Sequence, residues 1–199
     1  DSEVTVPETI DGYTVGEIGT MAFAGGGDER YDSVILDSKQ ITSVVLPETV
    51  KKIGAFAFDW NTSLVSVDMP DAVKVISSNA FERCVSLQNI DWPASLEAIG
   101  PMAFYKCDAL TSIQIPEGVT RIGSNAFGNC ENLESVTFPE SLTSIGYYAF
   151  ISDKKLKSVS IPDSVTVIGV AAFQECTSLK NITIPGGVTN ISAFTFLNC

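Results

Sequence analysis

The stretch LTSIQIPEGVTRIGSNAFGNCEN, residues 110–132, decides the fold, because the same pattern returns at a fixed interval along most of the chain. Its generalised form is L-x-x-V-x-I-P-x-x-V-x-x-I-G-x-x-A-F-x-x-C-x-x, with a period of 23 residues. A constant period of this length is typical of repeat proteins in which each unit stacks on its neighbours.

Three positions of the unit recur without insertion. The leucine position is filled at Ile41, Leu64, Leu87, Leu110, Leu133, Leu156 and Leu179. The proline position is filled at Pro47, Pro70, Pro93, Pro116, Pro139, Pro162 and Pro185. The phenylalanine position is filled at Phe58, Phe81, Phe104, Phe127, Phe150, Phe173 and Phe196, with Phe23 as an earlier copy. Residues 41–199 therefore contain seven repeats.

The unit predicts a coil of short extended segments. L-x-x-V-x-I alternates apolar and polar residues, so Val67 and Met69 should point inward while Ser66 and Asp68 point outward. Proline ends this strand because it has no amide proton for a ladder. The V-x-x-I-G segment predicts a second short strand, and A-F-x-x-C has room for one 3₁₀ or α-helical turn. Stacked coils should pair their strands in parallel and form one column of phenylalanines.

This pattern resembles the BspA-like (Treponema pallidum type) leucine-rich repeats of bacterial surface proteins. The fold that we expect is a mainly β solenoid, a right-handed leucine-rich-repeat coil with short parallel strands. The resemblance also implies an extracellular or cell-surface location and a role in adhesion to host proteins or to other bacteria.

The two ends differ from the middle of the chain. Residues 1–40 are expected to form an irregular N-terminal capping repeat with two insertions. The first holds Asp11-Gly12, a hairpin-turn signal; the second holds the glycine-rich run 25–30 and a short strand candidate at 34–36. The last repeat ends at Cys199 with no cap sequence, which predicts that residues 41–199 are a fragment of a longer protein.

Composition restricts the function classes. The chain has 199 residues, 45% hydrophobic and 18% charged, with a net charge of −12 and no histidine. An acidic chain repels nucleic-acid phosphates and anionic membranes. Histidine is the commonest general base and metal ligand, so we expect no enzyme, catalytic residue, metal or cofactor. No apolar run is long enough to cross a bilayer.

The five cysteines occupy one repeat position, at Cys84, Cys107, Cys130, Cys176 and Cys199, with Asn61 and Asp153 in the two other copies. Stacked equivalents have parallel Cβ directions, whereas a disulfide needs convergent ones. Buried free thiols are therefore the favoured interpretation, with a disulfide or a metal site as weaker alternatives. The Asn and Asp copies indicate a slot that hydrogen bonds to a neighbouring backbone.

The outward strand positions are the predicted interaction surface, because they vary while the core positions are constant. They include Asp68, Gln88, Asp91, Gln114, Thr137, Ser160 and Thr183. Asp68 and Asp91 are equivalent in adjacent coils and are expected close together, as a solvated pair in preference to a catalytic one. Trp60, Tyr105, Tyr147 and Tyr148 lie outside the core pattern and are candidate interface anchors, although covering the coil edges explains them equally. Trp92 is assigned to the core.

Three hypotheses for function follow. The first is a non-catalytic protein-interaction or adhesion module whose partner is a protein, such as a host extracellular-matrix or surface protein, or a glycan. The second is a structural spacer that presents another domain. The third is an enzyme or a glycan-binding accessory domain, which the missing histidine and motifs disfavour.

Overall fold

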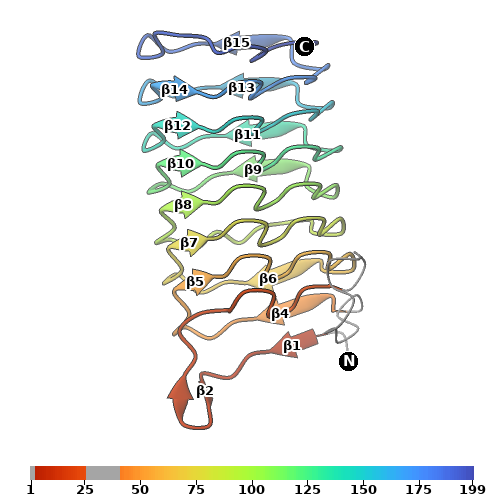
Figure 1. Ribbon diagram of the computed structural model, residues 1–199, viewed down its shortest axis with the longest axis vertical. Helices are drawn as coiled ribbons and strands as arrows, with labels where there is room; N and C mark the ends of the chain where they lie inside the picture. Colours follow the sequence, from red (N-terminus) through yellow and green to blue (C-terminus); the bar gives the residue numbers. More distant parts are fainter. Residues whose placement is uncertain (1–2, 26–40) are drawn as a thin grey trace.

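The chain folds as a solenoid. The computed structural model describes residues 3–25 and 41–199. Successive coils stack along the long axis, with the N- and C-terminal ends at opposite ends of the stack (Figure 1). The prediction of a solenoid of short parallel strands with very little helix is confirmed.

One strand per coil forms what we call the front strand row. Neighbouring strands of this row are parallel and offset by one repeat, so that Val136 lies opposite both Ile113 and Val159. The middle residue of each strand points into the core, and the predicted alternation is confirmed by buried Val67 and Met69 beside exposed Asp68. The strands are β1 (Glu3–Thr5), β4 (Ser43–Val45), β6 (Ser66–Asp68), β9 (Ser112–Gln114), β11 (Ser135–Thr137), β13 (Ser158–Ser160) and β15 (Asn181–Thr183).

A second series of shorter strands forms the back strand row, which is continuous from β5 to β14. A single bridge between Ile18 and Ile53 extends this row into the N-terminal coil, which precedes the first repeat. The strands are β5 (Lys52–Ile53), β7 (Val75–Ile76), β8 (Ala98–Ile99), β10 (Arg121–Ile122), β12 (Ser144–Ile145) and β14 (Val167–Ile168).

The third side of each coil, residues 55–60 and their equivalents, is a row of turns that we call the turn row. The predicted single helical turn does not form there, and no helix occurs anywhere in the described part of the chain. Alternate amides explain the difference. The Ala57 and Asp59 amides close local turns, whereas the Phe56 and Phe58 amides donate to Ser78 and Ala80 of the next coil at 3.0 and 2.7 Å. A helix would use all of these donors within one coil.

This alternation requires two left-handed residues per coil. In the first repeat, residues 41–63, they are Phe56 and Trp60, with φ of 55° and 60°, and equivalent residues recur through Asn198. Asparagine tolerates this conformation, but Met102 and Tyr148 adopt it against their intrinsic preference. Hydrogen bonds to the next coil therefore impose the backbone conformation on unsuitable side chains.

The glycine after the back strand serves close stacking. Its φ is not positive, but a Cβ at Gly123 would lie 2.4 Å from the Gly100 carbonyl carbon. Adjacent coils thus approach so closely at this corner that no side chain would fit.

The core is organised around the phenylalanine column. Consecutive rings from Phe23 to Phe196 stack nearly parallel, with centroids 5.0–5.9 Å apart. The rings from Phe58 to Phe173 are at most 1% exposed. The predicted column is confirmed, and it confirms the register of the repeats as well.

The N-terminal region departs from the repeat. β2 (Thr9–Ile10) and β3 (Tyr13–Thr14) pair as an antiparallel hairpin. Asp11 and Gly12 both have positive φ, as the Asp-Gly signal predicts. The glycine-rich run from residue 26 onward and the strand candidate at 34–36 lie outside the described residues.

The front strand row is interrupted at the third repeat coil, residues 87–109. Residues 89–91, which are equivalent to β6 and β9, form no strand. Where strands are paired, the Leu46 amide donates to the Asp68 carbonyl and the Ile115 amide to the Thr137 carbonyl, both at 3.0 Å. In the described chain, residues 89–91 pair with neither β6 nor β9. The back strand row and the phenylalanine column continue through this coil.

The phenylalanine column predicts where truncation destabilises most. Phe127→Ala should lower the free energy of unfolding by about 3–5 kcal/mol, because it removes a ring packed between two others. Phe194→Ala is the matched control: its ring is 61% exposed, so its loss should change stability by less than about 1 kcal/mol. Urea unfolding measures both. Equal losses in the two variants would contradict the column as the main core element.

Candidate binding face

The outward column of the front strand row is the candidate binding face. Gln114, Thr137, Ser160 and Thr183 lie side by side on consecutive paired strands, and all four are exposed. Asp68 holds the same position on β6, where it lies opposite Val45. Because two ladders of hydrogen bonds hold each inner strand, these side chains project from a fixed backbone.

The predicted Asp68–Asp91 pair is not held together by strand pairing. Asp91 belongs to the segment that leaves the front strand row, so the ladder that would place it opposite Asp68 does not form. Both side chains are exposed, as is Gln88. The expectation rested on an uninterrupted row, so the proximity of the two carboxylates stays a prediction that strand pairing does not support.

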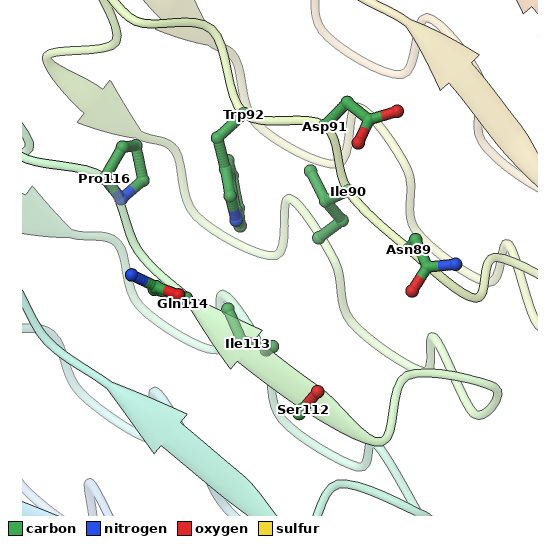
Figure 2. Close-up of a pocket in the computed structure, with 8 residues that line it drawn as sticks. All are labelled: Asn89, Ile90, Asp91, Trp92, Ser112, Ile113, Gln114 and Pro116. Atoms are coloured by element: carbon green, nitrogen blue, oxygen red, sulfur yellow. The ribbon is translucent and has the colours of Figure 1, made fainter.

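The interruption opens a hollow of about 430 Å³ between the third coil and β9. In Figure 2 the Trp92 ring extends from the third coil toward β9, between Pro116 and Ile90. Asn89 and Asp91 point away from the ring, at the rim of the third coil. The lining consists of Asn89, Ile90, Asp91, Trp92, Ser112, Ile113, Gln114 and Pro116.

Trp92 causes the hollow. It occupies the position of Leu46, Met69, Ile115, Phe138 and Ile161, which are all at most 8% exposed. Trp92 packs edge-on against Phe104 at 5.5 Å but remains partly exposed, as does Ile90. Its assignment to the core is therefore only partly right. The signal in the sequence was the size of its indole, which exceeds that of every equivalent residue.

Charge is unevenly distributed along the front strand row. Asp68 and Asp91 lie toward the N-terminal end, whereas Lys157 and Lys180 lie toward the other. Lys157 forms an exposed ion pair with Glu134 of the preceding coil. The hydrogen bond and charge of this lysine lower the pKa of Glu134.

Two predicted aromatic anchors lie in the turn row and are half-buried. The Arg83 guanidinium lies over the Trp60 ring at 4.3 Å, and the Trp60 Nε1 is buried with no hydrogen-bond partner in the described chain. The Tyr105 hydroxyl receives a hydrogen bond from Asn129 at 3.3 Å. Both rings therefore take part in contacts between coils.

Tyr147 and Tyr148 are more accessible, at 57% and 36% exposed. They follow β12, at the corner between the back strand row and the turn row. The structure thus does not unite the aromatic candidates with the polar column of the front strand row.

The cysteine position is a hydrogen-bonding slot, as its Asn and Asp copies indicated. Each cysteine Sγ donates to the carbonyl of a phenylalanine in the preceding coil, for example Cys84 to Phe58 at 3.1 Å and Cys107 to Phe81 at 3.2 Å. Asn61 donates to Phe23 in the same way. Burial raises the pKa of Cys84, Cys107 and Cys130. These thiols therefore stay protonated, the form that donates.

Asp153 fills this slot in the fifth repeat, residues 133–155, and is fully buried. Its Oδ1 accepts a hydrogen bond from the Cys130 amide at 2.8 Å, whereas its Oδ2 has no partner within the described chain. Each equivalent cysteine donates to a phenylalanine carbonyl of the preceding coil, so the acceptor expected for a protonated Asp153 is the Phe127 carbonyl. Burial raises the pKa of Asp153 well above 3.8, which favours the neutral acid, the form that can donate.

The described residues contain no group of three or more cysteine, aspartate or glutamate side chains placed to hold a metal ion. Nor does that part of the chain contain a helix with the length and apolar character of a membrane span.

The chain belongs to the BspA-type leucine-rich-repeat family. The model of the BspA type leucine rich repeat region matches residues 32–156 and 97–199, in six copies. No curated protein matches the chain.

Solved structures agree with this assignment. A leucine-rich repeat protein from Bacteroides ovatus is 36% identical over 93% of this chain and 46% of its own, with a TM-score of 0.81. A leucine rich cell surface protein from Faecalibacterium prausnitzii is 36% identical over 92% of this chain and 47% of its own, with a TM-score of 0.75. The T. pallidum leucine rich repeat protein is 32% identical over 90% of this chain and 78% of its own, with a TM-score of 0.77. The chain spans about half the length of the first two proteins.

The Asp153 slot predicts a pH-dependent gain in stability. Asp153→Asn should raise the free energy of unfolding at pH 7 by about 1–3 kcal/mol, because an amide donates without a titrating proton. Below about pH 4 the acid is neutral in both folded and unfolded states, so the gain should be small. As pH rises, the unfolded acid ionises while the folded one stays protonated. The free energy of unfolding of the wild type therefore falls as pH rises, whereas that of the variant does not.

Urea unfolding of both proteins between about pH 4 and pH 7 measures this difference. Asp163→Asn is the control, since Asp163 is exposed and its substitution should have little effect at any pH in this interval. A gain for Asp153→Asn that is equal at both ends of the interval would contradict a neutral buried acid.

Proposed function

We propose that this chain is the interaction module of a cell-surface or secreted bacterial protein, and that the front strand row binds a protein partner. One observation carries the proposal: Gln114, Thr137, Ser160 and Thr183 form an exposed column on a rigid, hydrogen-bonded sheet. These side chains differ from coil to coil while the buried positions remain apolar. A solenoid face of this kind offers a broad recognition surface without a deep cavity.

Family membership supports the location. One relative at 36% identity is described as a cell surface protein, and this chain matches about half of it. Leucine-rich-repeat folds are generally non-catalytic scaffolds that mediate protein binding, and a role in adhesion to host or bacterial proteins is the finer part of our proposal.

Charge along the row favours an oriented partner. An acidic end at Asp68 and Asp91 and a basic end at Lys157 and Lys180 would align a partner with the opposite arrangement. Electrostatic complementarity of this kind acts mainly on association rate and specificity, and salt weakens it.

A second candidate function is a structural spacer. The uniform stacking of the coils supports it, since an unbranched rod of repeats can hold another domain away from a surface. A spacer would not depend on which side chains occupy the front strand row.

Surface substitutions separate the two functions. Binding of the chain to a panel of purified extracellular-matrix proteins, including collagen, laminin and fibronectin, is measured by surface plasmon resonance. Thr137→Arg should weaken binding at least about tenfold, because a long cation disrupts the middle of the column. Thr166→Arg is the matched control: Thr166 is exposed, immediately before β14 of the back strand row, and its substitution should leave affinity unchanged.

Equal effects of the two substitutions would contradict the front strand row as the binding face. Failure of the wild-type chain to bind any protein of the panel would favour the spacer.

A further inference from the structure

The hollow beside Trp92 goes beyond the proposed protein-binding role, because it is a local cavity in the front strand row. It is confined to the front strand row. Behind it, β8 and β10 remain paired, and Phe104 and Phe127 remain stacked at 5.3 Å. Its volume of about 430 Å³ lies within the range of small-ligand pockets, about 300–1,000 Å³.

The hollow combines an aromatic ring with unused polar groups. Within the described chain, the side chains of Asn89, Asp91, Ser112 and Gln114 and the Trp92 indole N–H make no hydrogen bonds to protein. The Trp92 Nε1 atom is not fully buried, so solvent reaches it. Ser112 and Gln114 lie on β9, on one bank, whereas Asn89 and Asp91 lie at the rim of the other bank and point away from the ring (Figure 2).

Backbone groups at the hollow are also unused. The Val65 amide donates to the Thr42 carbonyl of the preceding coil and the Glu134 amide to that of Thr111, both at 2.8 Å. The equivalent amide of Thr111, the residue before β9, makes no such bond to Gln88 within the described chain. The bank formed by β9 therefore presents main-chain polar groups in addition to its side chains.

We propose that this hollow binds an uncharged saccharide. Sugar hydroxyls donate and accept at once, which suits a mixture of amide, hydroxyl, carboxylate and backbone N–H groups. The apolar C–H face of a sugar ring suits the partly exposed indole of Trp92 and the adjacent Pro116. A net charge of −12 and the carboxylates of Asp68 and Asp91 repel anionic sugars, so the ligand is neutral.

An inserted peptide strand suits the hollow less well. A strand paired on both sides needs about 4.8 Å of separation from each neighbour. The two coils that bound the hollow remain stacked at Phe104 and Phe127 and paired at β8 and β10, which limits how far they separate at the front. A compact ring that sits partly above the surface does not require this separation.

The chain has two tryptophans, and this gives a direct test. The indole N–H signals of Trp92 and Trp60 are followed by ¹H–¹⁵N NMR during titration with methyl glucopyranosides, methyl galactopyranosides, N-acetylglucosamine, lactose and cellobiose. At least one of these neutral sugars should shift the Trp92 signal saturably, with a Kd of about 0.1–10 mM. The Trp60 signal should not move, because its N–H is buried beneath Arg83. Sialyllactose should bind at least about tenfold more weakly than lactose.

Variants locate the site. Gln114→Thr should weaken binding about three- to tenfold by removing one amide, and Asp68→Thr, at the same repeat position outside the hollow, should leave it unchanged. Trp92→Leu installs the residue type of Leu46 and should abolish binding, measured by saturation-transfer NMR on the sugar signals. Circular dichroism and the unfolding midpoint check that each variant is folded.

Absence of a saturable Trp92 shift with every neutral sugar would overturn the proposal, as would equal weakening by Gln114→Thr and Asp68→Thr. A Trp92 shift produced by an extended peptide and by none of the sugars would overturn it in favour of strand addition. Neither result decides the Thr137→Arg test, because that test measures binding of protein partners and this one measures binding of sugars.

Discussion

The structure depends on one constraint: every coil must lie in the same register as its neighbour, which residues 41–199 achieve with a constant period of 23 residues. Equivalent residues then lie above one another, and hydrogen bonds join successive coils in the turn row, the back strand row and, except at its interruption, the front strand row. The phenylalanine column is the clearest consequence, because its consecutive rings stack within 5.9 Å, and Phe23 joins it although it lies 35 residues before Phe58. No coil could bury its own apolar side chains, so stability comes from neighbours.

The sequence predicted these columns but could not predict all of the local conformations. Alternation in residues 64–69 and the recurrence of Phe127 and its equivalents specified what is buried. Turn-row geometry was missed because residues such as Met102 and Tyr148 do not signal a left-handed backbone. Their conformation follows from hydrogen bonds to the next coil, which are non-local. The Asp153 slot was indicated by its Asn and Cys equivalents, whereas its buried, partnerless Oδ2 is visible only in three dimensions.

The candidate site shows the same division. The exposed column from Gln114 to Thr183 could be predicted because its register follows from the repeat. Its interruption could not, since it requires knowing that the Trp92 indole does not fit where Leu46 or Ile115 fits. A single large residue at an inward position thus converts a regular face into one with a hollow. The continuous back strand row and phenylalanine column confine the change to the front.

Deletion of one complete repeat tests the register most directly. Removing the 23 residues 113–135 joins Ser112 to Val136. In the native chain Val136 follows Ser135, the equivalent of Ser112 in the next repeat, so every column is kept. The shortened protein should fold and unfold cooperatively, with a modest loss of stability. Removing only 114–135 places Ile113 before Val136 and reverses the alternation of the next strand, so this protein should not fold. Cooperative urea unfolding of both proteins with similar midpoints would contradict the account.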